Sequence, residues 1–182
     1  MIEDDVSAPP VSLAEAQAFV RVEAGQEEAV LAGFVRSASG LCEAFIGQVI
    51  IARGFRQTLP MSGAWARLGR TPVRSIDLVE ALAEDGSATV LAPSAFAVDI
   101  DAAGDGWVKV TGGGSARRVR ISGQAGMATS GNGVPEPLRH GILRLVGHLF
   151  ANRDGGGISG PGGEPPAAVT ALWRPFRRLR LS

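Results

Sequence analysis

The stretch that most constrains the fold covers residues 135–153, which have the pattern of one long helix with a buried face. Pro135 and Pro137 suit the first turn of a helix, where a missing N–H group costs no hydrogen bond. Large apolar side chains then recur at spacings of four, three and four residues: Leu138, Ile142, Leu145 and Leu149. Burying each of them contributes about 1.5–3 kcal/mol. We therefore expect this helix at the centre of the core.

Two further helices are predicted near the N-terminus, after residues 1–11, which we expect to form a mobile arm. Ser12 and Glu15 have the spacing of a capping box, and a helix follows to about residue 22. Gly25 interrupts the pattern, and a second apolar stripe then runs to about residue 46. Cys42 lies on that stripe, so we interpret it as a small buried hydrophobe rather than a reactive thiol. Residues 12–53 and 134–153 are together predicted to form a helical core.

The periodicity changes after residue 50, where short alternating segments bounded by glycine and proline replace the helical stripes. Strands are predicted at residues 54–60, 73–82, 89–91, 96–101, 107–110 and 118–122. Asp85-Gly86 is a turn signal, and Arg118 and Arg120 should share one face of the last strand. Residues 54–133 are therefore predicted to be an antiparallel β module inserted into the helical core. The fold class is α+β, with two N-terminal helices and one long C-terminal helix in the core.

A Gly/Pro-rich hinge at residues 154–164 and a C-terminal segment at 165–182 complete the predicted organisation. After a short helical turn at 167–172, the extended tail holds two large aromatics, four arginines and no acid: Trp173, Arg174, Phe176, Arg177, Arg178 and Arg180. One interpretation is that these residues dock onto a partner and become ordered on binding. The other is that the tail packs on its own helices, with Trp173 and Phe176 filling gaps in the core.

Composition excludes several kinds of protein. The formal net charge is zero, so bulk charge indicates neither nucleic acid nor a membrane as a partner. A single cysteine excludes an intramolecular disulfide and fits a reducing compartment. The N-terminus lacks the features of a signal peptide, and no apolar run approaches the roughly 18 residues of a membrane span. An intracellular protein is expected. Lys109 is the only lysine among the 18 basic residues, which is typical of a GC-rich genome.

The sequence contains no recognisable catalytic constellation. His140 and His148 lie eight residues apart, which misses the i, i+4 spacing of a helical metal pair. The glycines at 112–114 lack the lysine and hydroxyl of a phosphate-binding loop, and the aspartates at 99–105 lack the spacing of a calcium loop. We therefore predict no enzyme activity, no metal site and no cofactor.

Both ends of the chain resemble the head–tail connector proteins of long-tailed phages. Residues 11–22 are similar to their first helix, and the end of their second helix is matched by Glu43-Ala44-Phe45-Ile46-Gly47. Their C-terminal helix is matched by Pro135, Leu138, Arg139, Ile142, Leu145, Val146, His148, Leu149, Phe150, Asn152 and Arg153. Their final segment is matched by Val169, Leu172, Pro175, Phe176 and Arg177. The match covers about half of the chain. It departs from the family at Phe150 and Phe176, where tyrosine is common, and in its long hinge.

The resemblance implies an adaptor, or head-completion protein, located in the neck of a virion and assembled in the host bacterial cytoplasm. Copies of such proteins form a ring, usually a dodecamer, beneath the portal protein of a filled capsid. The ring extends the DNA channel and joins the stopper or tail-terminator protein, while DNA passes without sequence-specific binding. The C-terminal segment engages the portal, which by this match assigns portal contacts to Trp173, Arg174, Phe176, Arg177, Arg178 and Arg180. The arginine-rich composition also fits a phage-derived gene transfer agent.

Two further expectations accompany this hypothesis. The channel surface should be acidic or neutral, because arginine–phosphate contacts would retard the DNA; the candidate acids are Glu80, Glu84, Asp85, Asp99, Asp101 and Asp105. The competing function is a small nucleic-acid-binding module that uses the arginines at 174–180. Against it, no motif that enters a groove of DNA is present.

Overall fold

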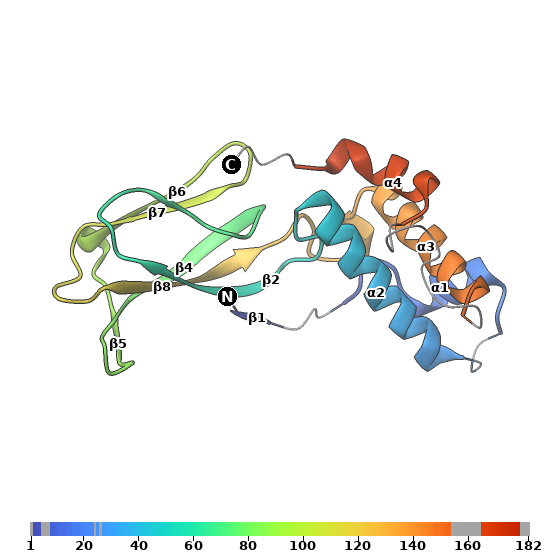
Figure 1. The fold of residues 1–182 in the computed structure, drawn as a ribbon, viewed down its shortest axis with the longest axis horizontal. Coiled ribbons are helices and arrows are strands. Elements are labelled where there is room, and N and C mark those ends of the chain that lie inside the picture. The colour runs from blue at the N-terminus through green and yellow to red at the C-terminus, as the bar shows by residue number, and fades with distance from the viewer. Residues whose placement is uncertain (1, 5–7, 24, 26, 154–164, 179–182) are drawn as a thin grey trace. The chain divides into compact units, whose positions relative to one another are not determined.

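The computed structural model describes the chain except for residues 1, 5–7, 24, 26, 154–164 and 179–182 (Figure 1). It divides into two compact units. The β unit comprises Met1–Ser7 and Ala52–Met127, and the helical unit comprises Ala8–Ile51 and Ala128–Ser182. Helices and antiparallel sheets thus occupy separate parts of the sequence, which confirms the predicted α+β class.

The helical unit contains α1 (Leu13–Val20), α2 (Glu28–Ile46), α3 (Glu136–Ala151) and α4 (Ala167–Trp173). Two 3-10 turns accompany them, η2 (Gly131–Gly133) and η3 (Arg174–Phe176). The capping box at the start of α1 is present: the Glu15 backbone N–H donates to the Ser12 hydroxyl, and the Ser12 N–H donates to the Glu15 carboxylate at 2.8 Å. The residue after α1, Arg21, adopts a left-handed conformation that ends the helix.

The core of this unit forms where the apolar stripes of α2 and α3 meet. The α3 stripe lies where the sequence places it, because Leu138, Ile142 and Leu145 are fully buried and Leu149 is nearly so. From α2 the buried residues are Leu31, Val35, Ala38, Cys42 and Ile46. Burial raises the pKa of the Cys42 thiol, so this cysteine behaves as the small buried hydrophobe predicted above.

Among the residues that the structure describes, α2 is the one helix with the length and mean hydropathy, 1.4, of a membrane span. This is weak evidence for a membrane, because core helices share both properties. The α2 stripe packs against α3 and buries five side chains, as the core helix of a globular unit does.

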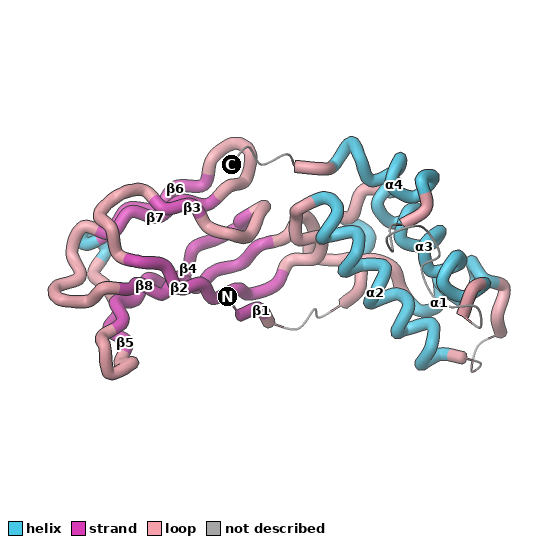
Figure 2. Tube along the Cα trace, viewed as in Figure 1, coloured by secondary structure: helices cyan, strands magenta, loops and turns pink. Residues whose placement is uncertain are grey.

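The β unit contains two antiparallel sheets, drawn in magenta in Figure 2. The larger sheet has the order β1-β2-β8-β4-β5: β1 (Ile2–Glu3), β2 (Arg53–Pro60), β8 (Arg118–Ala125), β4 (Val73–Leu82) and β5 (Ala88–Val90). The smaller sheet has the order β3-β7-β6: β3 (Ala66–Arg67), β7 (Gly106–Val110) and β6 (Phe96–Ile100). Between β5 and β6 lies a 3-10 turn, η1 (Pro93–Ala95).

The strand pattern agrees with the alternation in the sequence. On β8, Val119 and Ile121 are buried, whereas Arg118 is exposed and Arg120 half-buried on the opposite face. Asp85-Gly86 forms the turn between β4 and β5, where the Asp85 carboxylate accepts from the Ser87 N–H at 2.9 Å. Two strands were not predicted. β3 has two residues, and β1 lies within the expected mobile arm but pairs with β2.

Candidate docking surface at the C-terminal segment

The C-terminal segment is described from Pro165 to Arg178, and it folds onto the helical unit. Pro166 is the N-cap of α4, whose seven residues run directly into η3. The apolar side of this short helix is formed by Val169 and Trp173, which are 1% and 0% exposed. The segment therefore contributes two side chains to the core of the unit.

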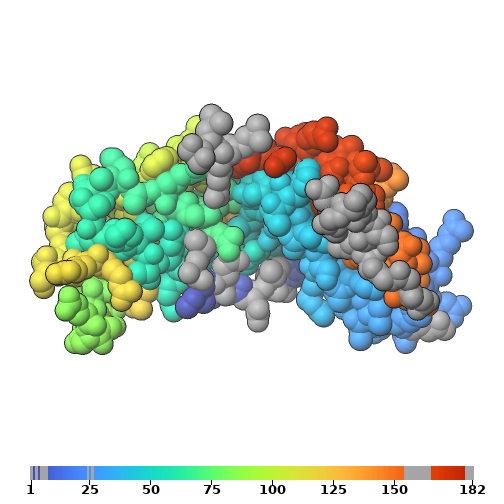
Figure 3. Space-filling view, in the orientation of Figure 1, coloured from blue at the N-terminus to red at the C-terminus, as the bar shows by residue number. Residues whose placement is uncertain are grey.

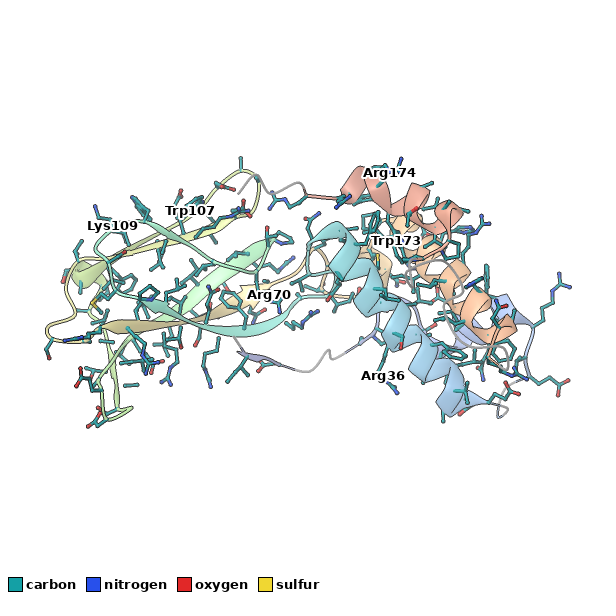
Figure 4. The ribbon with its side chains drawn as sticks, viewed as in Figure 1. Arg36, Arg70, Trp107, Lys109, Trp173 and Arg174 are labelled. Carbon is teal, nitrogen blue, oxygen red and sulfur yellow. The ribbon has the colours of Figure 1, made fainter. Side chains whose placement is uncertain are left out.

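Trp173 is fixed in the core from three sides. Its indole Nε1 donates to the Leu138 carbonyl at 3.3 Å, and its ring lies 5.9 Å from that of Phe45. Gly141 gives it room, since a Cβ atom there would lie 2.1 Å from the indole nitrogen. Figure 4 shows Trp173 among the helices and Arg174 on the outer side of α4. The structure thus supports, for Trp173, the second of the two sequence interpretations.

The chain beyond Trp173 runs along the C-terminal end of α2. The Gln48 side chain donates to the Phe176 carbonyl at 2.6 Å, and the Arg178 N–H donates to the Ile46 carbonyl at 2.9 Å. The Arg177 guanidinium lies 5.4 Å from the centre of the Phe45 ring. Residues 165–178 therefore already have partners within their own chain. They do not need a binding partner to become ordered, as one sequence interpretation expected.

The outer side of this segment carries three arginines, Arg174, Arg177 and Arg178. We name them the arginine surface. Arg174 and Arg177 are exposed, whereas Arg178 and Phe176 are half-buried. Within the described part of the chain, no carboxylate pairs with Arg174 or Arg177. Arg180, the sixth predicted contact residue, lies outside the described residues.

Other arginines of the same unit have acidic partners. Arg139 pairs with Glu136 at 2.6 Å and with Glu15, and Arg153 pairs with Glu27 at 3.0 Å. Hydrogen bonds from Ser12, assisted by the Arg139 charge, lower the pKa of Glu15. Arg174 and Arg177 differ from these arginines because, in the described part of the chain, neither pairs with a carboxylate.

A shallow groove on the helical unit was not predicted. It has a volume of about 570 Å³ and is lined by Phe19, Val20, His140, Arg144, Gly147, Phe150 and Ala151. The Phe19 ring meets His140 edge to face, with centroids 6.4 Å apart. The lining of the groove combines residues of α1 and α3, so no local sequence pattern predicts it. The groove is open and has a mixed polar and apolar lining, and its lining residues include no pair of nucleophile and base.

Most of the acids proposed for a channel surface have partners inside the β unit. Glu80 accepts two hydrogen bonds from Arg120, at 2.7 and 3.0 Å, and this pairing lowers the pKa of Glu80. Asp105 pairs with Arg67, and Asp101 accepts from the Trp107 indole at 3.1 Å. Glu84 lies 3.7 Å from Arg117, and Asp85 caps its own turn. Asp99 is exposed. Which acids face a channel stays a prediction.

The described residues contain no group of three His, Cys, Asp or Glu side chains close enough to hold a metal ion. His140 is exposed at the groove, and His148 lies on α3 beside Asn152, whose amide donates to the His148 carbonyl at 2.8 Å.

The sequence matches no protein-family model and no curated protein. Solved structures do resemble it. A chain of the neck of an empty gene transfer agent (GTA) particle, computed with C6 symmetry, superposes with a TM-score of 0.76 at 24% identity. This chain shares the fold of that neck chain. A chain from the virion of a native GTA particle gives 0.74, and one from the neck of a native particle with C12 symmetry gives 0.70, both at 24% identity. Each match covers 100% of this chain and 98% of the other.

Proposed function

We propose that this protein is a structural adaptor in the neck of a virion-like particle, with a mechanical and non-enzymatic role. The observation that carries the proposal is the similarity in fold to GTA neck chains. The match covers 100% of this chain and 98% of the other. The motifs at both ends of the sequence, which resemble those of head–tail connector proteins, support the same role independently. Copies of the chain form a ring beneath the portal protein, extend the DNA channel and join the stopper or tail terminator.

Within this proposal the arginine surface is the portal contact. Its two exposed arginines are held on a segment that is hydrogen-bonded to the end of α2, so their backbone needs little further ordering on binding. Carboxylates on the portal would pair with them once the contact excludes water. Trp173 acts from beneath, by holding α4 and η3 in place. Phe176 contributes apolar area at the margin of the contact.

The test is a pull-down of the chain by the portal protein encoded with it. Arg174→Glu and Arg177→Glu should each lower the affinity roughly tenfold or more, because a like charge then faces the portal carboxylates. Arg36→Glu is the matched control, since Arg36 is an exposed arginine on α2 that points away from Arg174 in Figure 4. If all three variants bind like the wild type, the arginine surface is not the portal contact.

The same variants test the nucleic-acid alternative. A module that binds phosphates through these arginines would hold duplex DNA with an affinity that falls steeply with salt. Loss of DNA binding in Arg174→Glu, with portal binding unchanged, would favour that function over the adaptor.

A further inference from the structure

Two strands of the β unit have an outer edge that is unpaired along its whole length in the described part of the chain. In the described residues, β5 ends the larger sheet and β6 ends the smaller one. Figure 1 shows them on opposite sides of this unit, β6 along one margin and β5 at the end of a hairpin on the other. The green atoms of that hairpin project from the β unit in Figure 3.

The hydrogen-bond register shows which backbone groups of β6 face outward. Asp101 donates its N–H to Asp105 at 3.0 Å, and Thr111 donates to Ala95 at 2.8 Å. Hydrogen-bonded pairs alternate in an antiparallel ladder, so residues 95, 97, 99 and 101 face β7. The N–H and C=O groups of Phe96, Val98 and Ile100 therefore point away from the sheet.

The same reasoning applies to β5. Ala83 donates to Ser87 at 2.9 Å and Leu91 donates to Val79 at 3.0 Å, which extends the pairing with β4 over residues 87–91. The backbone groups of Ala88 and Val90 then point away from β4. Each open edge is thus about five residues long, whereas the other two edge strands, β1 and β3, have two residues each.

Neither edge carries the usual protection against pairing. Natural edge strands are blunted by lysine, proline or inward-pointing charge, and β5 and β6 contain no lysine and no proline. Their apolar side chains are open to solvent instead: Val90 is 62% exposed, Val98 43% and Ile100 40%. The one charge, Asp99, sits at a position whose backbone already faces β7.

From these observations we propose that the β5 edge of one copy pairs with the β6 edge of the next copy, so that the β units form the subunit contact of the ring. A strand edge is complemented by another strand edge, and this chain carries two different ones on opposite sides. Such a head-to-tail contact leaves one β5 and one β6 open on any incomplete assembly, and only a closed ring pairs them all. The inference rests on the ring proposed above and specifies which residues build it.

Cysteine cross-linking tests the pairing directly. Val90→Cys marks the β5 edge, Val98→Cys marks the β6 edge, and the native Cys42 is fully buried and does not compete. Each sample is treated with a bifunctional maleimide under two conditions. In one the chain is concentrated alone, and in the other it is mixed with the portal protein. We expect a covalent dimer when the two variants are mixed, and none from either variant alone. A chain with both changes should give a ladder of larger products.

The control is Gln124→Cys, an exposed position on the central strand β8, which pairs with β2 on one side and with β4 on the other. Mixed with either edge variant, it should give no cross-link. Dimers from Val90→Cys alone or Val98→Cys alone would show like edges pairing, which overturns the head-to-tail contact. No dimer from the mixture, even when the portal retains the chain, would overturn the pairing and leave the adaptor function standing. Failure of the portal to retain the wild-type chain would instead count against the adaptor.

Discussion

Gly141 and Trp173 are more than thirty positions apart in the sequence, yet the absence of a side chain at Gly141 allows Trp173 to be buried there. The glycine removes the side chain that would otherwise lie 2.1 Å from the indole nitrogen, and the indole fills the resulting space on α3. The indole Nε1 is the one polar atom of the buried Trp173 side chain, and it would be unsatisfied without a partner. Its hydrogen bond to the Leu138 carbonyl supplies that partner. A tryptophan held in this way is part of the core, although the sequence around it looks like a tail.

The first prediction concerns Trp173. Replacing it by alanine should lower the free energy of unfolding of the helical unit by about 3–5 kcal/mol, because a large buried side chain is lost and a cavity is left. Arg174→Ala, its exposed neighbour, should stay within about 0.5 kcal/mol of the wild type. Urea unfolding followed by the helical circular dichroism signal measures both. Equal stability of the two variants would show that Trp173 is not in the core.

The second prediction is a pH dependence at Glu15. Hydrogen bonds from Ser12, and then the Arg139 charge, hold its pKa below the ordinary value of 4.5. The folded state therefore favours the carboxylate, so its stabilisation is complete above that value and is lost as the pH falls through the lowered pKa. Glu15→Gln should be less stable than the wild type near neutral pH by under about 1 kcal/mol. The difference should shrink in acid. A difference that does not change with pH would contradict this account.

At the scale of elements, the C-terminal segment has two parts with different roles. Residues 165–176 support the fold through α4 and η3, whereas Arg177 and Arg178 follow η3 beside the end of α2. Truncation after Gly163 should therefore destabilise the helical unit, since Val169 and Trp173 leave the core. Truncation after Phe176 removes the Arg178–Ile46 hydrogen bond and the Arg177–Phe45 contact but leaves the core intact, so it should lower the melting temperature much less while weakening portal binding. Thermal melts and pull-downs of the two truncated chains decide between these outcomes, and equal melting temperatures would refute the division.

The elements with a sustained period could be predicted from the sequence. The stripes of α2 and α3 and the alternation of β4 and β8 specify helix, strand and buried face over eight residues or more. β1 and β3 could not be found, because two residues show no period. The burial of Trp173 was left open for a similar reason: α4 has seven residues, and the glycines before it suggest a tether. The groove at Phe19 depends on which residues α3 places opposite α1, and no local pattern contains that information.

For the whole molecule, charge and shape of the surface determine whether copies assemble alone. The formal net charge is zero, and the helices show no sustained heptad seam that would hold two copies together. We therefore predict that the isolated chain is a monomer or a weakly associated ring whose assembly is templated by the portal. Light scattering of dilute purified protein measures this. A stable closed ring without the portal would contradict the templating, although it would leave the proposed β5–β6 contact intact.

The central claim is that this chain forms a neck ring on the portal. Electron microscopy of the chain mixed with the portal protein encoded with it tests that claim most directly. The account predicts a closed ring of copies, coaxial with the portal, with the residues from Arg174 onward at the contact. Portal rings that remain bare at saturating concentrations of the chain, or copies bound away from the portal axis, would contradict it.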